Sequence, residues 1–503
     1  MLCGYANLIE QFDIKTIPLR VKAVASSAVN KKLRQSNQLI VPERMAPPAN
    51  SPFDHVLFAM KHEGVNLAVL SEVLPKINKE ELLAALYEMP SSAMLHKISF
   101  LWEYFTKDTI DFNCPNKGYS TLFDGEKYIT GPIEKNQKWK VAYNGIGPLS
   151  YCPTVEKTDL IKQGLEKNIL ALTKKLFDEI GSEYLDRALN WAYLSETKGT
   201  YDLERENVGG DKAKNFMKLL RHVKDACSIN ESYLCDLQNE IVNNQFNHAF
   251  AFRSEQNWLA QGGSPSALSV TYIPPSPEVI CDLMDGYMKM INGWNGFVDP
   301  VISAAIASFG FVYLHPFMDG NGRLSRFLIH HQLSKSDLIG DGVILPISVA
   351  LKKRESEYLE ALKAFSAPAR DLWDAVFSGG DPLYDFTFYG TDSVYRYWDA
   401  TTQVEFFFDI AEHALNVHLR EEVEYLLRFD EIERIVNDRF DIRNNDRMLL
   451  ISVAMERNGE LSKNIRRKFS ERVPPEVFDF IEMETKKVLG ATANANYIDF
   501  SLS

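Results

Sequence analysis

The spacing of apolar residues predicts a mostly α-helical chain. In "SSAMLHKISFLWEYF" (residues 91–105), apolar residues recur every three or four positions, so one face of a helix would be buried. "FDHVLFAMKHEG" (residues 53–64) shows the same spacing. A longer segment after residue 156 is expected to form one helix, with one apolar face. That face holds Ile161, Leu165, Ile169, Leu172 and Leu176.

Three stretches interrupt the helical pattern. In "STLFDGEKYITG" (residues 120–131), two short strands are expected around the Asp124-Gly125 turn, with "KWKVAYNG" (residues 138–145) as a third. Residues 253–277 hold paired glycines and paired prolines, so they are expected to form a hairpin or a loop. "SGGDPLYDFTFYG" (residues 378–390) marks a further boundary.

With 503 residues, the chain is too long for a single core, and two to four domains are expected. The pattern predicts an α+β N-terminal domain over 1–155, a central helical domain over 156–385 and a helical C-terminal domain over 386–503. "DRMLLISVAMERNGELSKNIRRKF" (residues 446–469) predicts a helix, a turn and a basic second helix, which fits a winged-helix-like unit.

Composition narrows the classes of partner. Lys and Arg number 55 against 68 Asp and Glu, and the net charge of -13 argues against nucleic acid as the main partner. The six cysteines form no C-x-x-C pair, which indicates buried free thiols in a reducing compartment. We see no secretory signal, and the longest apolar run, "VILPISVAL", is interrupted by Pro346. These features predict a cytoplasmic protein with no membrane partner.

The segment "HPFMDGNGRLSRFLIHH" (residues 315–331) concentrates the chemistry. Before it, "DPVISAAIASFGFVYL" predicts a buried helix that begins at an Asp299-Pro300 cap and ends at His315, because Pro316 blocks its continuation. After it, "RLSRFLIHHQL" predicts a second helix with Leu324, Phe327, Leu328 and His331 on its inner face; His330 and His331 would serve packing.

The turn between these helices has the composition of a polyphosphate site. Free N–H groups at a helix N-terminus attract anions, and the glycines at 320 and 322 let the backbone approach a phosphate. Arg323 and Arg326 are three residues apart and lie on one side of the helix. Asp319 is most simply a Mg²⁺ anchor beside phosphates, and His315 can act as a base near neutral pH.

These residues resemble the Fic family motif H-x-F-x-[D/E]-G-N-G-R-x-x-R at every defined position. The resemblance covers roughly residues 165–375 and includes "FRSEQNWLAQGG" followed by "YIPPSPEVICDLM", which is similar to the family's flap and the helix after it. It implies an all-helical Fic domain with a β-hairpin flap, and a protein adenylyltransferase that moves AMP from ATP to a Ser, Thr or Tyr hydroxyl.

The resemblance also implies roles for single residues. His315 would take the proton from the target hydroxyl, and Asp319 would hold Mg²⁺ on the α- and β-phosphates of ATP. Arg323 would bind the β-phosphate and Arg326 the γ-phosphate. Phe317 would anchor the turn in the core. The anion hole would be lined by Gly320, Asn321 and Gly322. The flap, at about 254–272, would hold the target segment by backbone pairing.

A second resemblance concerns regulation. "LNWAYLSETKGTYDLERENV" (residues 189–208) is similar to the inhibitory helix of the Fic group in which that helix is N-terminal, and its motif is [S/T]-x-x-x-E-[G/N]. Thr200 to Glu204 fit the motif, while Arg205 departs from the expected Gly or Asn. A Glu204 that pairs with Arg326 would occupy the γ-phosphate partner and exclude productive ATP.

Several alternatives stay open at this level. The same fold could use UTP or a phosphocholine-bearing donor, Glu204 could support removal of AMP, or the chain could be a non-catalytic interaction protein. A transcription regulator acting through the C-terminal segment is opposed by the net charge of -13. The sequence does not identify the target protein, does not decide whether the chain forms a homo-oligomer, and does not define the role of the N-terminal domain.

Overall fold

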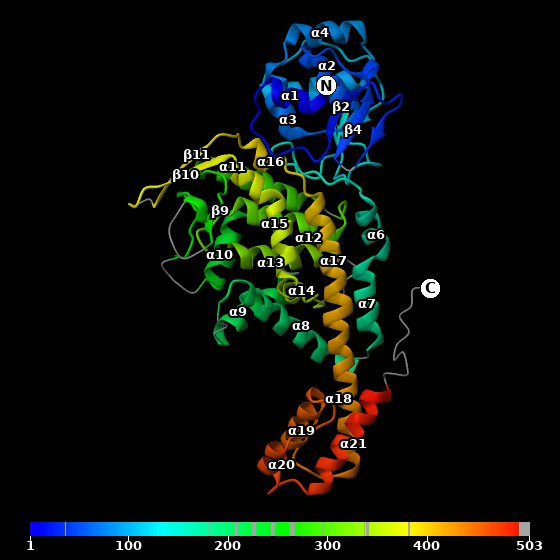
Figure 1. Ribbon diagram of the computed structural model, residues 1–503, viewed down its shortest axis with the longest axis vertical. Helices are drawn as coiled ribbons and strands as arrows, with labels where there is room; N and C mark the ends of the chain where they lie inside the picture. Colours follow the sequence, from blue (N-terminus) through cyan, green and yellow to red (C-terminus); the bar gives the residue numbers. More distant parts are fainter. Residues whose placement is uncertain are drawn as a thin grey trace.

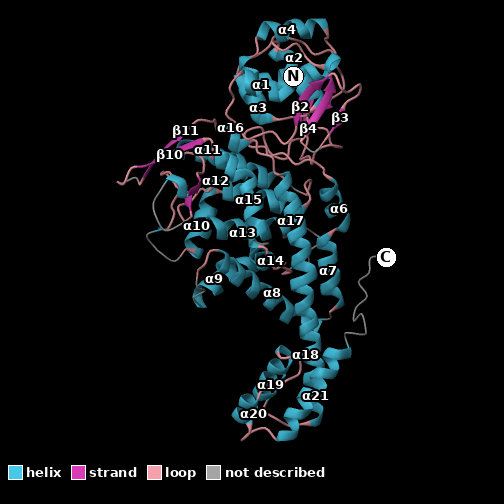
Figure 2. Ribbon diagram, viewed as in Figure 1, coloured by secondary structure: helices cyan, strands magenta, loops and turns pink. Residues whose placement is uncertain are grey.

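The computed structural model describes residues 1–35, 37–180, 182–206, 210–223, 228–242, 247–261, 267–294, 296–336, 338, 342–380 and 383–491. Three parts follow one another along the long axis (Figure 1): an α/β part with the N-terminus, a helical middle part, and a small group of helices that ends the chain. Strands are few and short, and helices dominate (Figure 2), as the apolar spacing predicts. The fold class is therefore confirmed as mostly α.

The N-terminal part combines a four-stranded sheet with helices. The sheet has the order β1-β2-β4-β3; β2 runs parallel to β4, and the other pairs are antiparallel. The strands are β1 (Leu2–Cys3), β2 (Lys22–Ser26), β3 (Leu33–Arg34) and β4 (Gln38–Pro42). The helices are α1 (Gly4–Gln11), α2 (Pro52–His62), α3 (Leu67–Val73), α4 (Lys79–Glu88) and α5 (Ala93–Thr106). Both helices predicted in this part, α2 and α5, are present.

A three-stranded sheet follows, and it corrects one prediction. Its strands are β5 (Ser120–Thr121), β6 (Glu134–Asn136) and β7 (Val141–Tyr143), in the order β5-β7-β6. The strand expected directly after the Asp124-Gly125 turn is absent, because the backbone N–H of Tyr128 donates a hydrogen bond to the carbonyl of Asp124 within the turn. Ile129 then bonds Val155 rather than β5. The third predicted strand, β7, is present and pairs parallel with β5.

The helix expected after residue 156 is two helices. Residues from Ile161 to Leu176 divide into α6 (Asp159–Lys167) and α7 (Ile169–Glu179), because Asn168 adopts a left-handed φ of 46° between them. The Asn168 side chain accepts a hydrogen bond from the backbone of Ala171 and so begins the second helix. Apolar spacing alone did not reveal this break.

The middle part packs around two central helices. α12 (Pro300–Leu314) is buried along nearly its whole length, and the Asp299 side chain caps it, as predicted. α13 (Asn321–Leu333) is also buried on almost every side, so the predicted inner residues Leu324, Phe327, Leu328 and His331 are buried together with most of the rest of the helix. The helices around them are α8 (Ser182–Leu203), α9 (Gly210–Arg221), α10 (Glu231–Ile241), α11 (Pro277–Gly293), α14 (Ile347–Lys353) and α15 (Glu355–Arg370).

Two hairpins lie together at one edge of the middle part (Figure 1). The first contains β8 (Leu259–Ala260) and β9 (Val270–Tyr272), which pair antiparallel, in agreement with the hairpin or loop predicted over 253–277; residues 262–266 lie outside the described part of the chain. The second contains β10 (Trp373–Phe377) and β11 (Tyr384–Phe388). The ring of Trp258 packs against Tyr384 and Phe386 and so joins the two hairpins.

A long helical rod leads to the last part. After α16 (Ser393–Arg396), α17 (Thr401–His413), a π-helical turn (Ala414–Leu419) and α18 (Arg420–Arg439) follow without interruption. α19 (Asn444–Glu456), α20 (Lys463–Phe469) and α21 (Pro475–Ala491) complete the described chain. Within residues 393–491 the secondary structure is helical, without the strands of a wing. The domain boundaries at 155 and 385 stay a prediction.

Among the described residues, no helix combines the length and the apolar character needed to cross a membrane. Five of the six cysteines lie in the described part of the chain, and all five are free thiols, as expected. Cys3, Cys152 and Cys235 are buried as predicted, whereas Cys114 is half-buried and Cys281 is exposed, so burial was wrong for these two.

Candidate functional site

The predicted site lies where α12 ends and α13 begins. His315 terminates α12 with a left-handed backbone (φ 49°, ψ 57°). Phe317 is buried and packs against the rings of Phe252 and Phe311, so the turn is anchored in the core as expected. Asn321 donates to the carbonyl of Phe317 and accepts from its N–H, which closes the turn. The Asn321 side chain is therefore committed to the turn, and only its backbone is left to face a ligand.

The turn leaves the N-terminus of α13 without a side-chain cap among the described residues. Gly320 occupies the cap position with φ 87°, a left-handed conformation that side chains disfavour. A Cβ on Gly322 would lie 2.1 Å from Oε1 of Glu204. Glycine is therefore needed at these two positions for different reasons. Gly320 permits the left-handed backbone of the turn, and Gly322 leaves room for Glu204 at the end of α8.

His315 is poised as a neutral base. Its Nδ1 lies 3.2 Å from the backbone carbonyl of Val312. Because a carbonyl only accepts, Nδ1 must carry the proton, and the lone pair of Nε2 is left for another partner. Burial lowers the pKa of His315 to about 4. The imidazole is therefore uncharged at neutral pH and able to take a proton.

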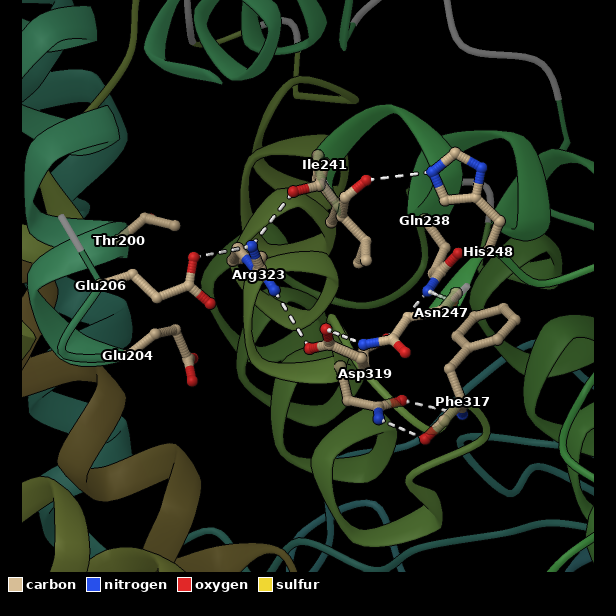
Figure 3. A network of polar contacts seen from close by, with 12 residues as sticks. Thr200, Glu204, Glu206, Gln238, Ile241, Asn247, His248, Phe317, Asp319 and Arg323 are labelled. Atoms are coloured by element: carbon tan, nitrogen blue, oxygen red, sulfur yellow. Dashed lines mark hydrogen bonds and ion pairs between the residues drawn. The ribbon is translucent and has the colours of Figure 1, made fainter. Parts of the chain in front are cut away.

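Both arginines are buried and lie in ion pairs with carboxylates. Arg326 donates to Oε1 of Glu204 at 2.5 Å and to the carbonyl of Thr200 at 3.2 Å. Arg323 donates to Oε2 of Glu206 at 3.2 Å and to Oδ1 of Asp319 at 3.1 Å, as Figure 3 shows. Arg323 also donates to the backbone carbonyl of Ile241 at 3.1 Å. Each buried guanidinium is thus held by one backbone carbonyl and paired with carboxylates that a phosphate could replace, which suits a polyphosphate site.

Asp319 points toward the same network. Its Oδ1 accepts from Arg323, and its Oδ2 accepts from the side-chain amide of Asn247 at 3.2 Å. Its backbone carbonyl accepts from the buried Gln238. The carboxylate is held between two donors and stays partly exposed, so a cation could reach it. Among the described residues, no group of three or more metal-binding side chains exists.

Helix α8 is held against the site by a buried polar cluster. Glu196 is fully buried and accepts from Nε2 of His330 at 2.7 Å and from the backbone N–H of Ser348 at 2.7 Å. The hydroxyl of Thr200 lies 2.8 Å from that of Ser348. A Cβ on Gly199 would lie 2.8 Å from the backbone of Ser348, so the close approach of α8 to α14 requires a glycine there. His330 thus fixes α8, which its assignment as a packing residue did not foresee.

Glu204 follows the last turn of α8, and the pair expected between Glu204 and Arg326 is present. Burial alone would raise the pKa of Glu204, but Arg326, with Arg323, outweighs burial and holds that pKa below its usual value. Arg205 has φ 57°. This left-handed position after a helix favours Gly or Asn, which explains why the motif has them there and what Arg205 departs from.

The flap region begins beside His315. Arg253 donates through Nε to the carbonyl of His315 at 2.9 Å. Asn257 donates to the carbonyl of Phe317 at 2.9 Å. The predicted flap spans about 254–272, and residues 262–266 of it lie outside the described part of the chain.

Sequence reasoning missed four contacts of this site. Glu206, Arg253 and Asn247 each touch a motif residue, and Glu196 fixes α8. Only Glu206 had a visible signal, since it is an acid two residues after Glu204. The others come from segments distant in sequence, so no local spacing could have identified them.

Comparison with known proteins gives a match over the site. Residues 228–333 match the model of the Fic/DOC family. A protein adenylyltransferase Fic from Drosophila willistoni is 34% identical over 93 residues, which is 18% of this chain and 17% of that protein. The protein of the same name from Drosophila melanogaster is 36% identical over 93 residues, 18% of each chain. This chain thus spans less than a fifth of these relatives.

A Fic family protein from Desulfovibrio desulfuricans G20, known from its crystal structure, overlaps 65% of this chain and 89% of its own. The identity is 16% and the TM-score 0.37.

Proposed function

Because the chain carries a domain of the Fic/DOC family, we propose that it transfers AMP from ATP to a Ser, Thr or Tyr hydroxyl of a target protein. The family match and the adenylyltransferase relatives indicate a Fic-type transferase. The choice of ATP, the protein target and restraint by Glu204 are the parts that we propose.

One observation carries the proposal. Two buried guanidinium groups, Arg323 and Arg326, follow a glycine turn at an uncapped helix N-terminus, and a neutral histidine stands on the other side of that turn. The arginines and the N-terminus favour a chain of phosphates. The base favours a proton transfer beside it. A nucleoside triphosphate is the common substrate that uses all of these groups.

In the proposed reaction, the free lone pair on Nε2 of His315 accepts the proton of the target hydroxyl. The target hydroxyl oxygen attacks the α-phosphorus, its proton passes to Nε2 of His315, the bond from the α-phosphorus to the bridging oxygen breaks, and pyrophosphate leaves. The hydrogen bond from Nδ1 to Val312 keeps the ring in the tautomer that can accept this proton. Arg323 and Arg326 would take the β- and γ-phosphates, which fixes the leaving group in line.

Asp319 fits a magnesium ion only together with nucleotide. It is one partly exposed carboxylate in a network of amide and guanidinium donors, and Mg²⁺ is commonly held by one or two carboxylates plus substrate phosphates. Such an ion would neutralise phosphate charge. Arg323 and Asn247 hold the carboxylate in place in its absence.

Glu204 is proposed to restrain the reaction. Its carboxylate is 2.5 Å from Arg326, so a γ-phosphate must displace it or bind elsewhere. A displaced γ-phosphate would shift the α-phosphate, and small errors of alignment cost large factors in rate. The cluster around Glu196 keeps α8, and thus Glu204, in this position.

The flap is proposed to present the target. β8 pairs with β9 on one side, and within the described residues its other edge has no strand partner, so an extended segment could add there.

The test is incorporation of label from α-labelled ATP into wild type, Glu204→Gly and Glu204→Gly/His315→Ala. Glu204→Gly should label itself or a target faster than wild type, because Arg326 becomes available to the γ-phosphate. The double variant should lose this gain. Incorporation by Glu204→Gly no higher than wild type would reject the restraint.

Parallel reactions with UTP and with a phosphocholine-bearing nucleotide distinguish other donors. Loss of AMP from purified labelled product on renewed incubation with wild type would identify the reverse reaction. Absence of labelling from any donor would contradict transfer as the function.

A further inference from the structure

Arg253 connects the base to the flap. Its guanidinium donates to three backbone carbonyls: those of His315 (2.9 Å), Glu255 (3.0 Å) and Pro275. Its own backbone N–H donates to the carbonyl of Pro316 at 2.8 Å. One side chain therefore ties the end of α12 to both ends of the segment that carries the flap.

These acceptors are neutral, and the guanidinium is deeply buried, with 5% of the residue exposed. Burial lowers the pKa of Arg253 to about 10, which still leaves it charged at neutral pH. That charge also opposes protonation of His315. A buried arginine that donates to several carbonyls fixes backbone positions more rigidly than a lysine could, because its guanidinium group is planar and has five N–H donors.

His315 needs such support. It is a non-glycine residue in a left-handed conformation, which a side chain disfavours. Asn257 adds a second donor 3.5 Å from the same carbonyl. If the His315 backbone relaxed, its Nδ1 would leave the carbonyl of Val312, and the tautomer that frees Nε2 would no longer be favoured.

We propose that Arg253 is a positioning residue that fixes the conformation and tautomer of His315 and couples them to the flap. Its effect on transfer rests on the proposed function; its effect on the tautomer does not.

The experiment compares Arg253→Lys with Asn257→Ala, each in wild-type and His315→Ala backgrounds. One ammonium cannot reach three carbonyls, so Arg253→Lys should lower kcat by roughly 10- to 100-fold, while KM for ATP stays within about twofold. Asn257→Ala should lower kcat less. In the His315→Ala background neither change should lower kcat further. Arg447→Lys is the control, because Arg447 is a buried arginine with three hydrogen bonds far from this site.

Nitrogen-15 NMR of the histidine rings gives a readout without activity. His315, assigned by its absence in His315→Ala, should be protonated at Nδ1 in wild type and in Arg447→Lys, and a mixture of tautomers in Arg253→Lys. Unchanged tautomer and unchanged kcat in both Arg253→Lys and Asn257→Ala would overturn the proposal. A changed tautomer in a protein that transfers no AMP would support it and reject the transferase.

A different observation carries a second inference. Arg323 lies in a chain of polar contacts that runs from Glu206 through Arg323 and Asp319 to Asn247 (Figure 3). Glu204 pairs with Arg326, and Glu206 pairs with Arg323. Each acid therefore occupies a different arginine, although the two acids are only two residues apart. The turn after α8, with Arg205 in its left-handed conformation, is what directs both carboxylates to the site.

We infer that Glu206 is a second regulatory acid, which competes with the β-phosphate where Glu204 competes with the γ-phosphate. This inference rests on the proposed nucleotide site. The Glu206 side chain is 35% exposed, as is that of Glu204, so water reaches both carboxylates and a phosphate can displace either one from its buried arginine. The two acids then differ in which nucleotides they oppose, since ADP has a β-phosphate and ATP has both.

Calorimetric titration of ATP and ADP separates the two acids. Glu206→Gln should strengthen binding of both nucleotides by a similar factor of about 2 to 10, the range of an exposed ion pair. Glu204→Gln should strengthen ATP but leave ADP within about twofold of wild type. Asp202→Asn removes a carboxylate from the same end of α8 as the control.

Glu206→Gln with unchanged ADP affinity would overturn the inference, whether or not ATP affinity rises. If wild type and all variants bind neither nucleotide, the nucleotide site itself fails, and this inference fails with it.

Discussion

The two sides of the turn at residues 315–326 are held by different kinds of interaction. On the side of the base, Arg253 and Asn257 hold the carbonyl of His315 by hydrogen bonds to neutral backbone groups. On the side of the arginines, Arg326 and Arg323 each donate to one backbone carbonyl, but Glu204 and Glu206 also hold them through ion pairs. A phosphate can replace a carboxylate, but no substrate replaces a backbone carbonyl. The base is thus fixed permanently, while the arginines are occupied by groups that a ligand can displace.

Loss of the base itself should have the largest effect. His315→Ala should lower AMP transfer by roughly 10²- to 10⁴-fold, the usual contribution of a general base. Binding of ATP should change little, because the turn and the arginines remain. Rates of α-labelled AMP incorporation, with ATP affinity measured by calorimetry as the control, test this. A wild-type rate in this variant would remove His315 from the reaction.

The pH dependence should differ from that of an ordinary histidine. Burial lowers the pKa of His315 to about 4 from 6.5, so the folded protein binds fewer protons than the unfolded chain between these pH values. Its stabilising contribution is complete above about pH 6.5 and is lost as the pH falls through about 4. In Glu204→Gly, kcat/KM should accordingly fall near pH 4. A fall centred near 6.5 in protein shown by circular dichroism to be folded would contradict the buried base.

The residue at position 205 should determine how firmly Glu204 and Glu206 are held beside the two arginines. Arg205→Gly places the residue that a left-handed φ of 57° favours, so it should stabilise this turn by about 1 kcal/mol. Glu204 and Glu206 would then be held more firmly, and basal transfer should drop severalfold. Thermal unfolding and AMP incorporation measure the two effects. Faster transfer by Arg205→Gly would show that the turn does not hold the acids in place.

Ionic strength should have the smallest effect on the transfer rate. It should weaken the ion pairs of the arginines but not the hydrogen bonds that hold His315. Raising ionic strength from about 0.05 M to about 0.5 M screens exposed ion pairs far more than buried hydrogen bonds. The ratio of transfer rates, Glu204→Gly over wild type at saturating ATP, should fall a few-fold toward one. The saturated rate of Glu204→Gly should change little. A constant ratio would indicate that the ion pair of Glu204 is not what limits wild type.

The centre of this site could be predicted from local sequence patterns. Asp299 caps α12, Pro316 blocks it, and the glycines at 320 and 322 mark the turn, because caps, prolines and glycines act through their own backbone. The predicted side of α13 that carries Arg323 and Arg326 follows from helical geometry alone. Local rules sufficed wherever a residue's role depends on its near neighbours in the chain.

The residues that surround this centre come from distant segments and depend on long-range packing. Apolar spacing could not show the break at Asn168, since a single left-handed residue leaves the spacing intact. Nor could it show that Glu196 meets His330, or that Arg253 meets His315, because these pairs lie 134 and 62 residues apart. Buried polar groups must find partners wherever the fold places them, and only packing brings such distant partners together.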